Sequence, residues 1–150
     1  MIQMSITVRP AAIEDADLIF SFVCALEEDH FHRDTFHQLY RGNIQNKDYC
    51  YRVAVDCTGK IIGYISCHSQ VLLHHGGKAC EVQEFFVDES YRNRGVGRQL
   101  MLAVEAYAWA EQARVFEVTV NLKRKRAVEF YLSSGFALTH IKLVKHPPVY

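Results

Sequence analysis

The sequence has no excess of either charge, because seventeen lysine and arginine residues balance seventeen aspartate and glutamate residues. No overall field therefore attracts nucleic acid or an anionic membrane, and any polyanion has to be bound at a local site. Apolar runs are short, and none approaches the roughly 20 residues that cross a bilayer. The first ten residues lack the charged and apolar regions of a secretion signal. We expect a cytoplasmic protein that binds neither nucleic acid nor membrane.

Cysteine is present, but not in a pattern that supports a disulfide framework or a zinc site. The five cysteines are odd in number and scattered, and no two of them form a C-x-x-C pair. We expect reduced, mostly buried thiols, as is usual in the cytoplasm. These residues are Cys24, Cys50, Cys57, Cys67 and Cys80.

The chain of 150 residues is 49% hydrophobic, which suffices for one core, and we expect a single domain over residues 1–150. Hydrophobic periodicity and turn residues predict strands at 6–9, 49–56, 61–69, 79–88, 115–120 and 136–144. Helices are predicted around 18–26, 34–44, 95–113 and 125–135. This order predicts an α+β fold with a mixed, mostly antiparallel central sheet of six or seven strands, flanked by four helices.

The stretch "YRNRGVGRQLM", Tyr91 to Met101, follows the predicted strand 79–88 and opens a helix. Free backbone amides at a helix start bind anions, and glycine lets an anion approach the backbone closely. The third small residue of a dinucleotide-binding fingerprint is missing, and so is the GK[ST] of a P-loop. On local chemistry alone, a phosphate site and a solvated turn both remain open.

The wider context resembles the GNAT superfamily of acetyl-CoA-dependent N-acetyltransferases. The family pattern R/Q-x-x-G-x-G/A is filled by Arg92, Gly95 and Gly97. A second family hallmark is matched downstream by Asn121, Arg124, Ala127, Phe130, Tyr131, Gly135 and Phe136. The resemblance implies acetyl-CoA as cosubstrate, with its pantetheine along Phe86 and Val87. It also implies contacts to the cofactor from Arg92, Asn93, Arg94, Gly95, Val96, Gly97, Arg98, Asn121 and Arg124.

Acetyl transfer to an amine needs a base, and the predicted strand 79–88 offers Glu81 and Glu84. On a regular strand these two side chains face opposite sides, and only a β-bulge between them lets both reach one cleft. The resemblance favours Glu81 as general base, leaving Glu84 as a substrate-binding or supporting residue. It also matches Tyr131 to the family tyrosine near the CoA sulfur, a candidate general acid.

Shorter stretches, "LHHGGKACEVQEFFV" and "EEDHFHRDTF", are similar to aminoalkylphosphonate N-acetyltransferases. That resemblance implies a small amine bearing a phosphonate as substrate, and raises a divalent metal as a possible second cofactor whose ligands stay open. A dianionic phosphonate attracts cationic groups, and the candidates are His74, His75, His32 and Arg41. Another amine acceptor, or a CoA-binding regulator without turnover, remains an alternative. A homodimer is common in the family, but no residue indicates one.

Overall fold

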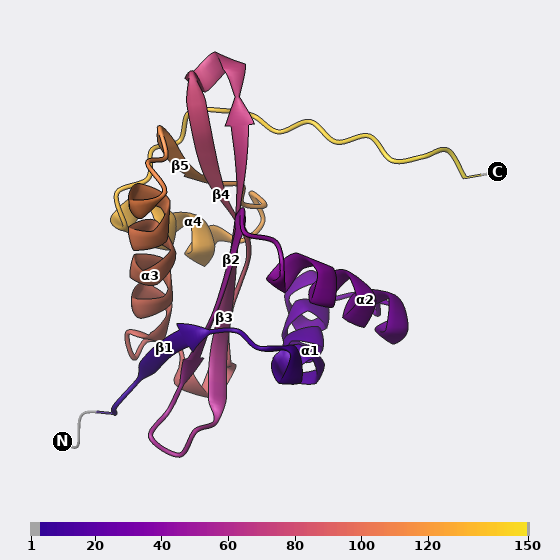
Figure 1. The fold of residues 1–150 in the computed structure, drawn as a ribbon, viewed down its shortest axis with the longest axis vertical. Helices are drawn as coiled ribbons and strands as arrows, with labels where there is room; N and C mark the ends of the chain where they lie inside the picture. Colours follow the sequence, from indigo (N-terminus) through magenta and orange to yellow (C-terminus); the bar gives the residue numbers. More distant parts are fainter. Residues whose placement is uncertain (1–3, 150) are drawn as a thin grey trace.

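The computed structural model describes residues 4–149, and its central feature is one sheet of five strands in the order β1-β2-β3-β4-β5 (Figure 1). Neighbouring strands are antiparallel except β4 and β5, which are parallel. The mixed, mostly antiparallel α+β fold is thereby confirmed. The strands are β1 (Thr7–Pro10), β2 (Tyr49–Val55), β3 (Ile61–Leu72), β4 (Gly77–Val87) and β5 (Val115–Val118). The helices are α1 (Ala16–Glu27), α2 (Arg33–Ile44), α3 (Val96–Ala110) and α4 (Lys125–Ser133).

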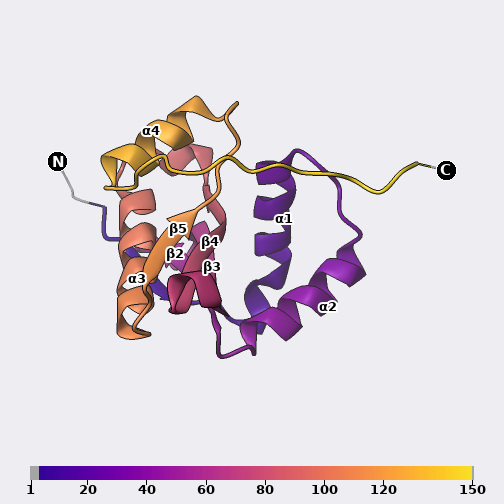
Figure 2. The same cartoon turned by 90° about the horizontal axis from the view of Figure 1, so that it is seen from above.

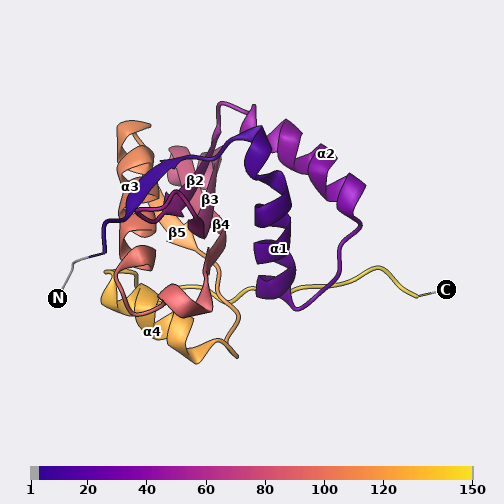
Figure 3. The same ribbon diagram turned by 90° about the horizontal axis from the view of Figure 1, so that it is seen from below.

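The helices form a layer on each face of the sheet: α1 and α2 lie on one side, α3 and α4 on the other (Figures 2 and 3). Alternation along the strands sends side chains into both layers. In β2, for example, Tyr51 and Val53 pack toward α1 and α2, whereas Cys50 and Ala54 pack in the cluster around α3. Both faces are therefore buried. None of the helices in the described part of the chain is long and apolar enough to cross a membrane.

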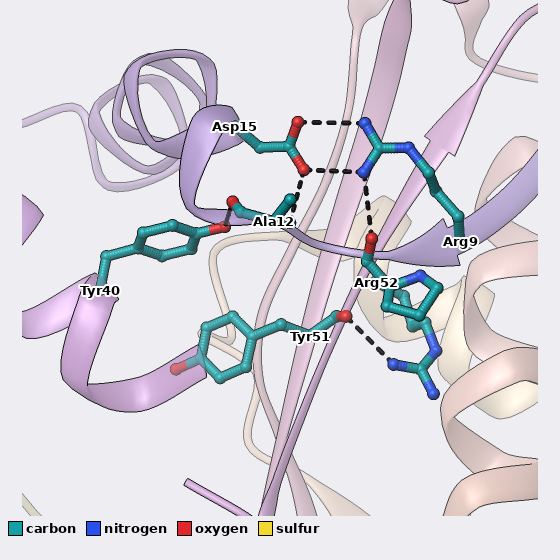
Figure 4. Close-up of polar contacts among 7 residues, drawn as sticks. Arg9, Ala12, Asp15, Tyr40, Tyr51 and Arg52 are labelled. Atoms are coloured by element: carbon teal, nitrogen blue, oxygen red, sulfur yellow. Dashed lines mark hydrogen bonds and ion pairs between the residues drawn. The ribbon is translucent and has the colours of Figure 1, made fainter. Parts of the chain in front are cut away.

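A polar cluster fixes the angle at which β1 leads into α1 (Figure 4). The guanidinium of Arg9 donates two hydrogen bonds to the carboxylate of Asp15, at 2.8 and 3.0 Å. The backbone N–H of Ala12 donates to the same carboxylate at 2.7 Å, and the hydroxyl of Tyr40 donates to the carbonyl of Ala12 at 2.6 Å. These bonds join strand β1 and the segment after it to the start of α1 and to α2.

Strand β4 contains a β-bulge. Its partner β3 places Cys67 opposite Val82 and Ile65 opposite Phe85, so three steps along β4 match two steps along β3. One extra residue therefore shifts the alternation of side chains between the two halves of β4.

The strand expected at 136–144 is wrong, so the sheet has five strands rather than six or seven. Residues 136–149 contain no regular secondary structure, and this segment, in yellow in Figure 1, crosses the molecule before it extends beyond α1 and α2. The pattern of alternating apolar residues is that of a strand, but a strand also needs a neighbour for its backbone groups. Strand β5 is consequently the last strand of this sheet, and its four residues are only half-buried.

Candidate active site

The two parallel strands β4 and β5 separate after a short pairing, and this opening forms a cleft. Pairing covers only Ala79–Val82 with Val115–Val118, so residues 83–87 of β4 have no strand beside them on that edge. A cavity of about 340 Å³ lies at the opening, within the size range of small-molecule sites. Its lining includes Leu26, Glu27, Glu81, Val82, Gln83, Phe85, Val118, Thr119, Val120, Asn121, Arg124, Ala127, Tyr131 and Lys142.

The cavity brings together the two residues predicted to carry the chemistry, Glu81 of β4 and Tyr131 of α4. The carboxylate of Glu81 is half-buried and accepts a hydrogen bond from the hydroxyl of Thr119 at 3.0 Å. That bond fixes one carboxylate oxygen and leaves the other oxygen of Glu81 without a hydrogen bond in the described part of the chain. A carboxylate held in this way is suited to accept a proton in the cavity.

The bulge places Glu84 on the same face of the sheet as Glu81. Directly paired strand residues share a face, and Glu81 is opposite His68, whereas Glu84 accepts a hydrogen bond from Tyr64, four residues from His68 on β3. Glu84 does not line the cavity. Burial raises the pKa of its carboxyl above the ordinary value, although the bonds from Ser66 and Tyr64 oppose the shift. Glu84 is therefore a half-buried neighbour of the site.

The side chain of Tyr131 is buried among Phe85, Phe130 and Phe136, with ring centroids 5.6 to 6.2 Å from its own, and only 8% of it is exposed. Burial raises the pKa of its hydroxyl to about 12, and the positive charge of Arg124 opposes that shift. The hydroxyl is therefore protonated at neutral pH.

The glycine-arginine loop opens α3 next to the cleft. Gly95 caps the helix with φ of 82°, in the left-handed region that favours glycine, and a Cβ there would meet open space. The first backbone amides of α3 have no carbonyl of their own helix to bind. Packing also favours glycine at position 97, because a Cβ added there would lie 3.0 Å from the ring of Phe85.

The remaining residues of this loop are mostly exposed, so its positive charges lie at the surface of the protein. Arg92 donates from Nε to the carbonyl of Val87 at 3.0 Å, and its guanidinium lies over the ring of Phe86. Asn93 has φ of 60°, and Arg94 lies over the ring of Tyr91. Val96 is buried under the loop, and Arg98 is exposed on the first turn of α3.

Asn121 and Arg124 organise the turn between β5 and α4. The side chain of Asn121 accepts a hydrogen bond from the backbone N–H of Lys123 at 2.9 Å. The guanidinium of Arg124 reaches across the cleft and donates to the carbonyl of Leu26, at the end of α1, at 2.6 Å. It also lies 3.9 Å from the carboxylate of Glu27. Arg124 therefore links the two helical layers at the open end of the sheet.

The structure does not bring the four predicted phosphonate-binding residues into this cavity. The rings of His74 and His75 lie against each other at an angle of 43° in a short turn at the tip of the β3–β4 hairpin. His32 caps α2, and Arg41 lines a separate hollow of about 190 Å³ between α1 and α2. Within residues 4–149, no group of three or more His, Cys, Asp or Glu side chains is arranged to hold a metal ion.

Sequence reasoning missed several residues that line the cleft, among them Thr119, Leu26 and Lys142. Thr119 follows a strand that was predicted correctly, but its bond to Glu81 depends on the way β5 lies beside β4. Lys142 falls in the segment that was predicted to be a strand. No local pattern marks any of these residues, because only the tertiary arrangement brings them to the cleft.

Comparison with known proteins assigns the chain to a family. The family model described as Acetyltransferase (GNAT) family matches residues 14–136. The chain therefore belongs to the GNAT acetyltransferases, enzymes that transfer an acetyl group from acetyl-CoA to an amine. More particularly, it is 31% identical over 137 residues to an aminoalkylphosphonate N-acetyltransferase of Salmonella typhimurium, which covers 91% of this chain and 88% of that protein.

Solved structures show the same fold. An aminoglycoside 6'-N-acetyltransferase of Acinetobacter baumannii has a TM-score of 0.82 at 18% identity, covering 97% of this chain and 100% of that one. An aminoglycoside N-acetyltransferase in complex with CoA has a TM-score of 0.85 at 17% identity, covering 97% of each chain. At these identities the likeness establishes the fold and leaves the acceptor amine open.

Proposed function

We propose that this enzyme acetylates a small primary amine that carries a phosphonate group, with Glu81 as general base and Tyr131 as general acid. The observation that carries the proposal is the single cleft that contains both side chains at the opening between β4 and β5. The 31% identity with an aminoalkylphosphonate N-acetyltransferase supports this choice of acceptor.

The open edge of β4 and the start of α3 support the binding of acetyl-CoA as cosubstrate. Residues 83–87 have no paired strand on this edge, and the backbone groups that remain free there suit an extended amide-containing chain such as pantetheine. The first amides of α3, together with Arg92, Arg94 and Arg98, suit the pyrophosphate. Asn93, Gly95, Val96 and Gly97 supply backbone to the same turn.

In the proposed reaction, Glu81 takes a proton from the substrate ammonium group, directly or through one water molecule. The neutral nitrogen then attacks the thioester carbonyl, and backbone N–H groups near Phe86 stabilise the oxyanion. When the tetrahedral intermediate collapses, the new C–N bond remains, the C–S bond breaks and the amide nitrogen releases its second proton. The products are the acetylated amine and CoA.

Tyr131 acts on the leaving sulfur. Because its pKa is about 12 and that of an ordinary thiol is about 8.5, complete transfer of its proton to a thiolate is uphill by roughly three units. Most of its contribution is therefore a hydrogen bond to the sulfur while negative charge develops there. Full protonation of CoA then draws on the solvent or on the proton that the amine released.

Two cations line the cleft where a phosphonate would have to lie, Arg124 and Lys142. Their charges suit a dianion, and the planar guanidinium of Arg124 is able to bind two of its oxygens. His32, Arg41, His74 and His75 remain predicted phosphonate ligands, although they do not line the cleft.

The substrate is tested by mixing the protein with acetyl-CoA and following the release of free thiol. Aminomethylphosphonate and 2-aminoethylphosphonate are expected to release CoA, each measured with and without Mg²⁺ or Mn²⁺. Glycine and β-alanine, which carry a carboxylate in place of the phosphonate, serve as matched acceptors and are expected to react far more slowly. If neither phosphonate releases CoA under any of these conditions, the proposed acceptor is wrong.

The base is tested with Glu81→Gln, which retains the size and the hydrogen bond to Thr119. We expect kcat to fall by roughly 10²–10⁴-fold, the contribution of a positioned base, while the Kd for CoA stays the same. Glu105→Gln on α3 is the matched control and should leave kcat unchanged. Unaltered turnover in the Glu81 variant would exclude this residue as the base and direct attention to Glu84.

A further inference from the structure

The cavity between β4 and β5 contains a carboxylate that has no part in the proposed reaction, that of Glu27. Glu27 is the last residue of α1, and one of its carboxylate oxygens lies 3.9 Å from a terminal nitrogen of Arg124. At that distance the two groups attract each other without forming a hydrogen bond. The carboxylate of Glu27 is therefore able to accept a hydrogen bond from a ligand in the cavity.

The position of Arg124 brings any anion that it binds close to Glu27. The same terminal nitrogen of Arg124 donates to the carbonyl of Leu26 at 2.6 Å, and this bond holds the guanidinium beside the end of α1. A guanidinium has five N–H donors, so the bond to Leu26 leaves most of them for a ligand. An anion in the cavity thus meets the donors of Arg124 and the carboxylate of Glu27 together.

The charges at this corner of the cavity match an anion with one negative charge. Arg124 and Lys142 alone would suit a dianion, but the negative charge of Glu27 leaves a net charge of one positive unit. Strand β4 adds no cation here. Glu81 lines the same cavity, and the charge of Glu27 is one of the causes, after burial, that raise the pKa of the Glu84 carboxyl. A dianion beside Glu27 would therefore be repelled.

A phosphonate avoids this repulsion if it keeps one proton, and a sulfonate of the same shape has no proton to keep. The second proton of a phosphonate titrates near neutral pH, as that of a phosphate ester does. The protonated form has a P–OH group, and an O–H donor forms a strong hydrogen bond to a carboxylate. A sulfonate is fully ionised, and its three oxygens are acceptors only. Beside Glu27 it would bring one acceptor against another.

We propose that Glu27 is a specificity-determining residue, which accepts a hydrogen bond from a singly protonated phosphonate and thereby disfavours sulfonates. The inference rests on the proposed acetylation of an aminoalkylphosphonate and defines how the acid end of that acceptor is recognised. Arg124 and Lys142 bind the two unprotonated oxygens, and the one remaining proton lies between the third oxygen and the carboxylate of Glu27. No covalent bond to phosphorus is formed or broken.

Two matched acceptors test the specificity, 2-aminoethylphosphonate and 2-aminoethanesulfonate, which share the same chain and amine. In wild type kcat/KM should be at least roughly tenfold higher for the phosphonate, the value of one hydrogen bond to a charged group that is partly exposed. In Glu27→Gln this ratio should fall by roughly tenfold, in part through a gain of activity with the sulfonate. Such a gain cannot arise from partial unfolding. Glu28→Gln removes the same charge outside the lining of the cavity and should keep the wild-type ratio.

Titration calorimetry of the CoA-loaded enzyme gives a measurement that needs no turnover. At about pH 8.5 free 2-aminoethylphosphonate is mainly a dianion, so its binding in two buffers of different ionisation heat reports any proton taken up. Wild type should take up close to one proton more than Glu27→Gln. If the acceptor ratio and the proton uptake are the same in both proteins, this inference is overturned while acetylation of the phosphonate stands. A wild-type enzyme that acetylates neither acceptor overturns the proposed function, and this inference with it.

Discussion

Removal of the carboxylate of Asp15 should destabilise the fold far more than its position next to the surface suggests. Asp15 is only 8% exposed and accepts three short hydrogen bonds, two from Arg9 and one from Ala12 (Figure 4). In Asp15→Ala the backbone N–H of Ala12 loses its partner in a partly buried position. A single hydrogen bond to a charged group contributes about 1.5–3 kcal/mol, and a stranded buried donor costs about 1–3 kcal/mol.

These contributions overlap and do not add. The side chain of Arg9 is 39% exposed, so water can replace the carboxylate around the guanidinium and reduces the loss. We therefore expect the free energy of unfolding to fall by about 2–3 kcal/mol. At about 2–4 °C per kcal/mol for a chain of this size, the Tm should fall by roughly 4–12 °C.

The assay is urea unfolding at several pH values, with Asp17→Ala as the matched control. Asp17 also pairs with an arginine, Arg33, at 2.6 Å, but it is 65% exposed, and we expect its removal to cost less than about 1 kcal/mol. If Asp15→Ala is no more destabilised than Asp17→Ala, the reasoning from buried hydrogen bonds is refuted.

The pH dependence gives a second test. Burial acts to raise the pKa of Asp15, but the hydrogen bonds from Arg9 and Ala12 prevail, so the pKa lies below its ordinary value. A lowered pKa stabilises the fold above the unfolded value of about 3.9, and the contribution is lost as the pH falls through the folded value. The difference between wild type and Asp15→Ala should therefore be largest near pH 7 and shrink below about pH 4. A difference that stays constant down to pH 3 would contradict this account.

Three further predictions concern the cleft. Burial raises the pKa of the Glu84 carboxyl, so its contribution to stability is complete below the unfolded pKa and declines as the pH rises. Glu84→Gln should therefore unfold at a higher urea concentration than wild type at pH 8. If the variant already has this advantage at pH 4, the raised pKa is not its cause. Tyr131→Phe should lower kcat by roughly 10–100-fold, the value of one hydrogen bond to a charged group, and a kcat unchanged in steady-state assays would remove Tyr131 from the chemistry. Gly97→Val should raise the KM for acetyl-CoA and lower the Tm, since its side chain would have to displace Phe85, and calorimetry showing an unchanged Tm would refute the contact.

Local patterns were sufficient for most of the fold. The periodicity around Leu18–Leu26 and the glycine turn before α3 correspond to helices in the structure. Three residues that create the first pattern, Ile19, Phe22 and Val23, are those that α1 buries, whereas Leu18 is exposed. The segment 136–144 shows the limit of this reasoning. Its pattern meets the side-chain requirements of a strand, but pairing depends on a neighbour, and the described chain provides none.

The residues expected to carry the chemistry could be named from the sequence. Glu81 and Tyr131 were predicted from the resemblance to one family, and both line the cleft, while their catalytic roles stay predictions. The shared face of Glu81 and Glu84 depends on an inserted residue in β4, which alternation alone does not reveal. Thr119 and Lys142 join the cleft from segments 38 and 61 positions after Glu81, so only the folded arrangement identifies them.

The bond from Arg124 to the carbonyl of Leu26 has a consequence for the order of folding. It joins residues 98 positions apart, and closing so long a loop is slow unless the intervening chain is already compact. The strands from β2 to β5 and the helices α2 and α3 lie within that loop and can assemble first. The cleft, whose walls extend from α1 to α4 and on to Lys142, is complete only when the last segments of the chain have docked. A refolding enzyme of this kind should recover its secondary structure before it recovers its activity.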